Sequence, residues 1–195
     1  MEIDLTKLET EVKIVMAGSA IIPIEALDFF SRDKSQEVRA SAFANLIATE
    51  EILDRGLKDE ATAVKIAALR NPNISGEQID KTVRENEDND DVKFYAAKSP
   101  KALEKTLDYL AHDKHPIIRR CVAWNPITPS DILRWLGNNK DSDFSILLQV
   151  ERNENTPKEV RMRLKEELRS GRLTVSEPSI KLLHNWVFLH GRRID

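Results

Sequence analysis

Apolar residues recur along this chain in a unit that is longer than a single helix. The clearest copy spans residues 118–136. Ile118 and Val122 lie one helical turn apart and predict a short first helix, which Asn125-Pro126 should end because proline cannot continue a helix. The segment 128–136 predicts a second short helix, since it opens with Thr-Pro-Ser-Asp, a capping residue with a first-turn proline, and continues with two leucines three residues apart.

The same unit occurs six times. Aligning the apolar residue that opens each first helix gives intervals of 26, 26, 28, 26 and 28 residues. An apolar residue follows one turn later, and the second half of each unit carries two large apolar residues three or four positions apart, which is the helical period. Helices this short bury their apolar faces only by stacking, so the opening residue and the residue four later should face inward. The six opening residues are Val12, Val38, Val64, Val92, Ile118 and Ile146.

These features predict an all-α fold in which six two-helix units form an α-solenoid. It should cover residues 1–170, with residues 1–11 lengthening the first helix into an N-terminal cap. Residues 171–195 predict a further apolar helix of the same domain. Two interpretations of this last helix stay open: it caps the sixth unit, or it docks a partner with Trp186 and Phe188 as anchors.

Short polar residues stand seven positions after each opening residue and suit the end of a helix. They are Ser19, Asn45, Asn71, Ser99, Asn125 and Asn153.

Two charged rows repeat with the units. A lysine or arginine follows the opening residue in units one to five, and an acid stands five residues before the opening residue of units two to six. The basic row could form a phosphate-binding strip or half of an acid–base ladder along the stack. The ladder is favoured, because acid and base recur together and a phosphate strip would not carry its own counter-ions. The bases are Lys13, Arg39, Lys65, Lys93 and Arg119, and the acids are Asp33, Asp59, Glu87, Asp113 and Asp141.

Composition and charge limit the class of protein and its location in the cell. The 195 residues are 41% hydrophobic and 32% charged with a net charge of -3, which describes a globular helical protein without a global attraction to nucleic acid. Cys121 is the single cysteine, so an intrachain disulfide and a four-cysteine zinc site are excluded. The N-terminus lacks a signal-peptide pattern and no segment approaches the ~20 apolar residues of a membrane span. We therefore predict a cytoplasmic protein that does not enter a membrane.

Catalytic motifs are absent from the sequence. It has no glycine-rich phosphate loop, no Gly-x-Ser-x-Gly elbow and no His-Glu-x-x-His. His112 and His115 could contribute to a metal site, and Arg119 and Arg120 could activate Cys121. An ordinary turn and a packed thiol are the favoured interpretations. No metal, cofactor or enzyme activity is expected.

The pattern V-R-x-x-x-A-x-N-P-x-T-P carries a family resemblance. It runs from Ile118-Arg119 to Pro129, recurs in part from Val64-Lys65, and returns in Asn153-Glu154-Asn155-Thr156-Pro157. It resembles the leucine-rich repeat variant, a member of the HEAT-like group. The resemblance covers about residues 12–168 and implies a right-handed superhelix of paired short helices. Some members carry an iron–sulfur cluster on a cysteine-rich N-terminal region, which this sequence lacks, so that cofactor is not expected.

HEAT-like alkylpurine DNA glycosylases are related by architecture. The resemblance implies that tryptophans and an aspartate would surround a flipped base in such an enzyme. Trp124, Trp135 and Asp131 are present, but no motif transfers the chemistry.

The candidate binding surface comprises the first-helix positions that the repeat pattern assigns neither to the core nor to the acid–base ladder. Positions two, three and six after each opening residue should share the remaining face of the first helix. In the later units they hold aromatic side chains among cations, the composition of interaction hot spots. The predicted function is a non-enzymatic scaffold that binds a protein there; the alternatives are that loops cover this face, or that the chain binds nucleic acid, first through its basic C-terminal region. The centre is Tyr95, Lys98, Arg120 and Trp124, beside Phe94, and the rim is Arg70 and Arg152.

Overall fold

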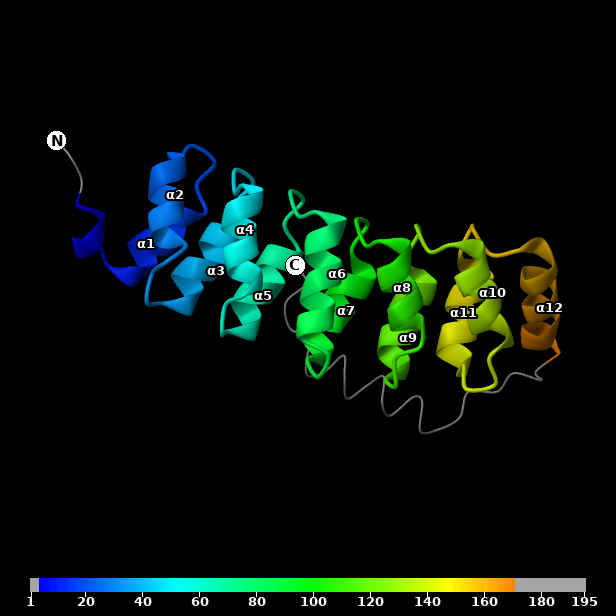
Figure 1. The fold of residues 1–195 in the computed structure, drawn as a ribbon. Helices are drawn as coiled ribbons and strands as arrows, with labels where there is room; N and C mark the ends of the chain where they lie inside the picture. Colours follow the sequence, from blue (N-terminus) through cyan, green and yellow to red (C-terminus); the bar gives the residue numbers. More distant parts are fainter. Residues whose placement is uncertain (1–3, 171–195) are drawn as a thin grey trace. The chain divides into compact units, whose positions relative to one another are not determined.

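Six helical hairpins follow one another along residues 4–170, the part of the chain that the computed structural model describes (Figure 1). Every regular element in this range is a helix, which confirms the predicted all-α solenoid of two-helix units. The helix predicted within 171–195 lies outside the described residues. The elements are η1 (Leu5–Lys7), α1 (Thr10–Ala17), α2 (Ile24–Phe30), α3 (Gln36–Ala44), α4 (Glu50–Leu57), α5 (Thr62–Leu69), α6 (Gly76–Glu85), α7 (Asp90–Lys98), α8 (Glu104–Ala111), α9 (Pro116–Trp124), α10 (Ser130–Asn138), α11 (Phe144–Arg152) and α12 (Lys158–Arg169).

The described helices fall into two compact bodies that divide after Leu103. The N-terminal body holds α1 to α7, and the C-terminal body holds α8 to α12. Within the N-terminal body the first helices α1, α3, α5 and α7 pack each on the next, and α4 packs on α6 in the second layer. Within the C-terminal body α9 packs on α11, and α10 lies between α8 and α12. The assignment of residues 1–170 to one domain stays a prediction.

The core consists of the residues that the repeat pattern singles out. In units two to six the opening residue and the residue one turn later are all fully buried. Burial of each valine or isoleucine in these pairs contributes about 1.5 to 3 kcal/mol, so the pairs stabilise the packing of neighbouring first helices. The buried pairs are Val38 and Ala42, Val64 and Ala68, Val92 and Ala96, Ile118 and Val122, and Ile146 and Val150.

The first unit departs from the prediction. Val12 is 44% exposed, because no helix of the described residues packs on the preceding side of α1. The expected lengthening of the first helix through residues 1–11 is also wrong. Residues 5–7 form the separate turn η1, where the Asp4 carboxylate accepts the Thr6 N–H at 3.1 Å, and α1 begins only at Thr10.

Two helical glycines permit close helix packing. A Cβ on Gly56 of α4 would lie 2.8 Å from the ring of Phe43 on α3, and a Cβ on Gly137 of α10 would lie 2.7 Å from Cγ1 of Val160 on α12. Any larger side chain at either position would push the two helices apart.

Buried asparagines connect successive units. Nδ2 of Asn71 donates to the carbonyls of Phe43 and Asn45, both at 2.8 Å, while its Oδ1 accepts the N–H of Asn73 at 2.8 Å. Each such asparagine therefore holds its own loop in shape and ties it to the end of the preceding first helix. The equivalent donor pairs are Asn45 to the Ala17 and Ser19 carbonyls, and Asn153 to the Ala123 and Asn125 carbonyls.

The row predicted to end the first helices largely does so. Asn45, Ser99, Asn125 and Asn153 are the residues directly after α3, α7, α9 and α11. The hydrogen bonds that these asparagines make between units are an addition that the sequence pattern did not predict.

Candidate interaction surface

The basic row that follows the opening residues belongs to the stack in the first two units. Nζ of Lys13 lies 2.9 Å from Oδ2 of Asp33. The Arg39 guanidinium donates two hydrogen bonds, of 2.7 and 2.9 Å, to the carboxylate of Asp59. These four side chains are only 11 to 15% exposed. Each base reaches the acid of the following unit, as an acid–base ladder requires.

The later units differ from this pattern. In unit four Nζ of Lys93 lies 2.8 Å from Oδ1 of Asp90 on its own helix, and units three and five use oxygens other than carboxylates. Nζ of Lys65 donates to Oδ1 of Asn86 at 2.7 Å instead of to the predicted Glu87. The buried Arg119 donates to the carbonyls of Asp113 and Asp141, at 2.8 and 2.9 Å. Lys65 and Arg119 thus keep a structural role, with an oxygen of a neighbouring turn as the acceptor.

The carboxylates of Asp33 and Asp59 both have lowered pKa values, which favours their ionised form. Burial raises the pKa of Asp59, but the hydrogen bonds from Arg39 and from the Ala61 N–H outweigh it, so its pKa lies below the ordinary value. Burial likewise opposes ionisation of Asp33, and the Lys13 ammonium and the Ser35 N–H again leave the pKa lowered. The pairing of Arg39 with Asp59 also raises the pKa of Arg39, chiefly through the hydrogen bond between them.

Four predicted site residues come together in the N-terminal body. On α7 the rings of Phe94 and Tyr95 meet edge to face with centroids 5.2 Å apart. Nζ of Lys98 lies 5.0 Å from the centroid of the Phe94 ring, and the guanidinium of Arg70, just after α5, lies 5.8 Å from that of Tyr95. All four side chains are at least partly exposed. The result is a pair of cations, each held over an aromatic ring.

The other three predicted site residues lie in the C-terminal body. Trp124 ends α9 and is 54% exposed, Arg152 ends α11 and is exposed, and Arg120 on α9 is half-buried. Because α9 packs on α11 and Trp124 and Arg152 hold the same repeat position, they belong to one layer of that body. The candidate surface is thus described as two half-sites, one on each body.

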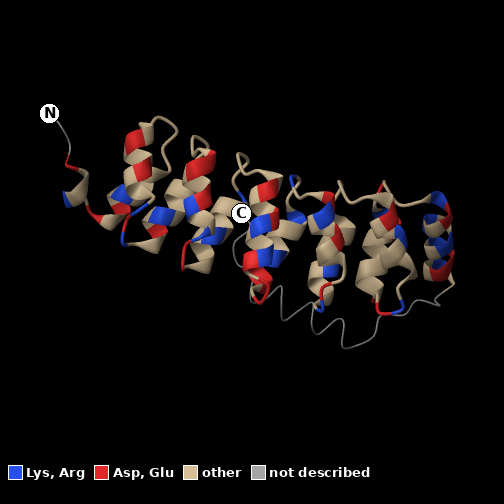
Figure 2. Ribbon diagram, in the orientation of Figure 1, with Lys and Arg blue, Asp and Glu red and all other residues tan. Residues whose placement is uncertain are grey.

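Two arginines of α12 are engaged with backbone carbonyls. In the basic C-terminal region, Arg161 donates to the carbonyls of Asn153 and Glu154, both at 2.8 Å, and Arg163 donates to the Gly137 carbonyl at 2.7 Å. Figure 2 shows both signs of charge interspersed on the helices of each body. These contacts leave fewer arginines for phosphate than the composition of the region implies.

The remaining chemical candidates have structural surroundings. His112 hydrogen-bonds the Asp108 carbonyl through Nδ1 at 2.8 Å, and its ring packs on Trp135 with centroids 4.0 Å apart. Cys121 is buried, which confirms the packed thiol. Asp131 is exposed in the first turn of α10. Within residues 4–170, no three His, Cys, Asp or Glu side chains gather as a metal site would require.

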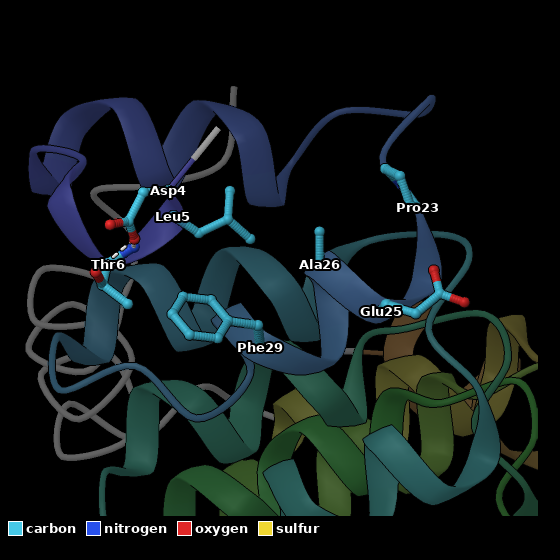
Figure 3. Close-up of a pocket in the computed structure, with 7 residues that line it drawn as sticks. All are labelled: Asp4, Leu5, Thr6, Pro23, Glu25, Ala26 and Phe29. Atoms are coloured by element: carbon cyan, nitrogen blue, oxygen red, sulfur yellow. Dashed lines mark hydrogen bonds between the residues drawn. The ribbon is translucent and has the colours of Figure 1, made fainter. Parts of the chain in front are cut away.

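A shallow hollow lies between η1 and α2 (Figure 3). Leu5, Ala26 and Phe29 give it an apolar side, and Asp4 and Glu25 stand at its edges. The Asp4 carboxylate already accepts the hydroxyl and N–H of Thr6, and its Oδ2 lies 3.2 Å from Nζ of Lys7. Among the described helices, none combines the length and apolar character that crossing a membrane requires.

Comparison with known proteins identifies the fold. No family model matches the sequence, and no curated protein matches it. A solved structure described as a leucine-rich repeat variant with a novel repetitive protein structural motif superimposes with a TM-score of 0.60 and 21% sequence identity, covering 83% of this chain and 67% of that one. The fold is that of a leucine-rich repeat variant. This confirms the resemblance drawn from the Asn-Pro-x-Thr-Pro pattern.

Proposed function

We propose that this leucine-rich repeat variant is a non-enzymatic scaffold that binds a protein through its aromatic and basic surface. The surface comprises Arg70, Phe94, Tyr95 and Lys98 on the N-terminal body, and Arg120, Trp124 and Arg152 on the C-terminal body. The observation that carries the proposal is the cluster on and beside α7, where two cations lie over two partly exposed rings.

This arrangement suits protein recognition for two reasons. Trp, Tyr and Arg are the residue types that dominate the energy of protein interfaces. In addition, Arg70 and Lys98 are already placed over rings, so binding loses less side-chain entropy than it would with unrestrained cations.

The test is a pull-down from the native cell with Tyr95→Ala and Trp124→Ala combined. We expect the double variant to keep the helical spectrum and melting temperature of the parent and to lose its protein partners. Trp135→Ala is the matched control, because Trp135 is also a partly exposed tryptophan but lies on a second helix against His112. It should retain the partners.

Two results would contradict the proposal. One is a folded double variant that captures the full set of partners. The other is captured nucleic acid in place of protein, with an affinity that falls steeply with salt, because phosphate contacts release counter-ions.

A further inference from the structure

The open face of the first helices in the N-terminal body is almost uncharged. We name the twelve positions two, three and six after the four opening residues the first-helix strip. Only two of its side chains carry charge at neutral pH, and both are cations of the aromatic cluster. The strip comprises Ile14, Val15, Gly18, Ala40, Ser41, Ala44, Ile66, Ala67, Arg70, Phe94, Tyr95 and Lys98.

The floor of this strip, at α3, consists of small side chains, and its one hydroxyl, that of Ser41, is hydrogen-bonded. The hydroxyl of Ser41 donates to the Ile14 carbonyl at 2.8 Å. A Cβ on Gly18 would lie 3.2 Å from the same hydroxyl oxygen, which shows how closely the end of α1 approaches α3. Alanines occupy the neighbouring positions of α3. A ligand lying here would meet short side chains whose one hydroxyl is already used.

Large exposed apolar side chains flank the floor. Val15 is 74% exposed on α1, Ile21 is 92% exposed in the α1–α2 loop, and Leu46 is 68% exposed in the α3–α4 loop. Asn45, directly before Leu46, donates to the Ala17 and Ser19 carbonyls, so the two loops lie against each other. These three side chains lie at or just after the ends of α1 and α3. Exposed apolar surface of this kind marks binding sites.

The cations continue the same row. Asn71 follows Arg70 and donates to the carbonyls of Phe43 and Asn45, which places Arg70 beside the loop that carries Leu46. The row thus begins apolar at the ends of α1 and α3 and becomes cationic at the ends of α5 and α7.

Carboxylates border the strip at other edges. Glu11, Glu37 and Asp91 stand one position before the opening residues, at the opposite ends of α1, α3 and α7. The Glu37 carboxylate accepts hydrogen bonds from Ser35 and Gln36. Glu50 begins the second helix α4. The strip itself therefore presents positive charge at its α5–α7 end alone.

We propose that the first-helix strip binds an amphipathic acidic segment of a protein partner, with its apolar side chains over α1 and α3 and its carboxylates against Arg70 and Lys98. This inference rests on the proposed protein-binding function and names the chemistry of the partner. Apolar contact supplies affinity, and the two cations set the charge preference and the direction of the segment.

The test is fluorescence polarisation with two synthetic amphipathic helical peptides. The first carries leucines on one face of the helix and glutamates on the opposite face, and the second has lysine in place of each glutamate. At low salt the full chain should bind the glutamate peptide about tenfold more tightly, since two partly exposed cations contribute modestly each. Arg70→Glu combined with Lys98→Glu should reverse the preference. Val15→Asp combined with Leu46→Asp should weaken both peptides, whereas Met162→Asp, at a 61% exposed position on α12, should weaken neither.

Equal affinity for the two peptides, or an unchanged preference in the charge-reversed variant, would overturn the inference. So would undiminished binding by the folded Val15 and Leu46 variant. These failures are separable from failure of the proposed function. If the Tyr95 and Trp124 double variant loses its partners while the peptides bind without preference, protein binding stands and the acidic segment does not.

Discussion

Substituting Asn71 tests whether the buried asparagines hold the repeats together. Asn71 is 2% exposed and makes three hydrogen bonds, two from Nδ2 to the preceding unit and one from the Asn73 N–H to Oδ1. Asn71→Ala removes all three and leaves two carbonyls and one N–H of the backbone without these partners. At about 1 kcal/mol net for each bond, the free energy of unfolding should fall by about 3 kcal/mol.

The assay is urea unfolding followed by far-ultraviolet circular dichroism. Asn73→Ala is the matched control. Nδ2 of Asn73 also donates to two carbonyls of the preceding unit, Leu46 at 2.7 Å and Ala48 at 3.2 Å, but Asn73 is exposed. Water can replace its bonds, so the cost should stay below about 1 kcal/mol.

Asn71→Asp separates hydrogen bonding from packing, because the two side chains have nearly the same shape. An ionised carboxylate would face two carbonyls, so its pKa should be raised and the variant should be less stable than Asn71→Ala at pH 7. Protonation restores one donor, so the deficit relative to the parent should shrink as the pH falls through that raised pKa. If Asn71→Ala costs no more than Asn73→Ala, the buried asparagines do not stabilise the stack.

Two further predictions concern packing and pH. Gly137→Ala should destabilise by about 1 to 3 kcal/mol in thermal unfolding, because its Cβ would lie 2.7 Å from Cγ1 of Val160. Gly18→Ala should cost less, because the nearest atom to its Cβ would be the Ser41 hydroxyl oxygen at 3.2 Å; equal effects would show that α10 and α12 adapt freely. The lowered pKa of Asp59 contributes stability that is fully present above the unfolded value of about 3.9 and is lost as the pH falls through the folded value. Asp59→Asn should therefore be less stable than the parent at pH 7 and approach it near pH 2, and a difference independent of pH would contradict the pairing with Arg39.

The sequence predicted the hairpins because each unit repeats the same buried pair at helical spacing. It also assigned Val12 the role of Val38. Periodicity describes a residue's place within its own unit, but burial also needs a neighbour on the preceding side. Among the described residues α1 has none, and Val12 is exposed while Val38 is fully buried.

Contacts between units were harder to predict than contacts within them. The sequence showed that acid and base recur together, but not that Lys65 would donate to the Asn86 oxygen in the turn that follows α6. The candidate surface was inferred from positions left over by the repeat. The placing of Arg70 over the Tyr95 ring joins residues 25 positions apart in sequence, and only the packing of α5 on α7 brings them together.

Site-specific photo-crosslinking at position 95 tests directly whether the aromatic and basic surface contacts a protein partner. A photoreactive phenylalanine analogue would replace Tyr95 on α7 in the native cell, with the same analogue in place of Met162 on α12 as the control. We expect a protein adduct at position 95 that is absent at position 162 and that is lost when Trp124→Ala is added. Adducts that are identical at the two positions, or that consist of nucleic acid, would contradict the assignment of this surface to a protein partner.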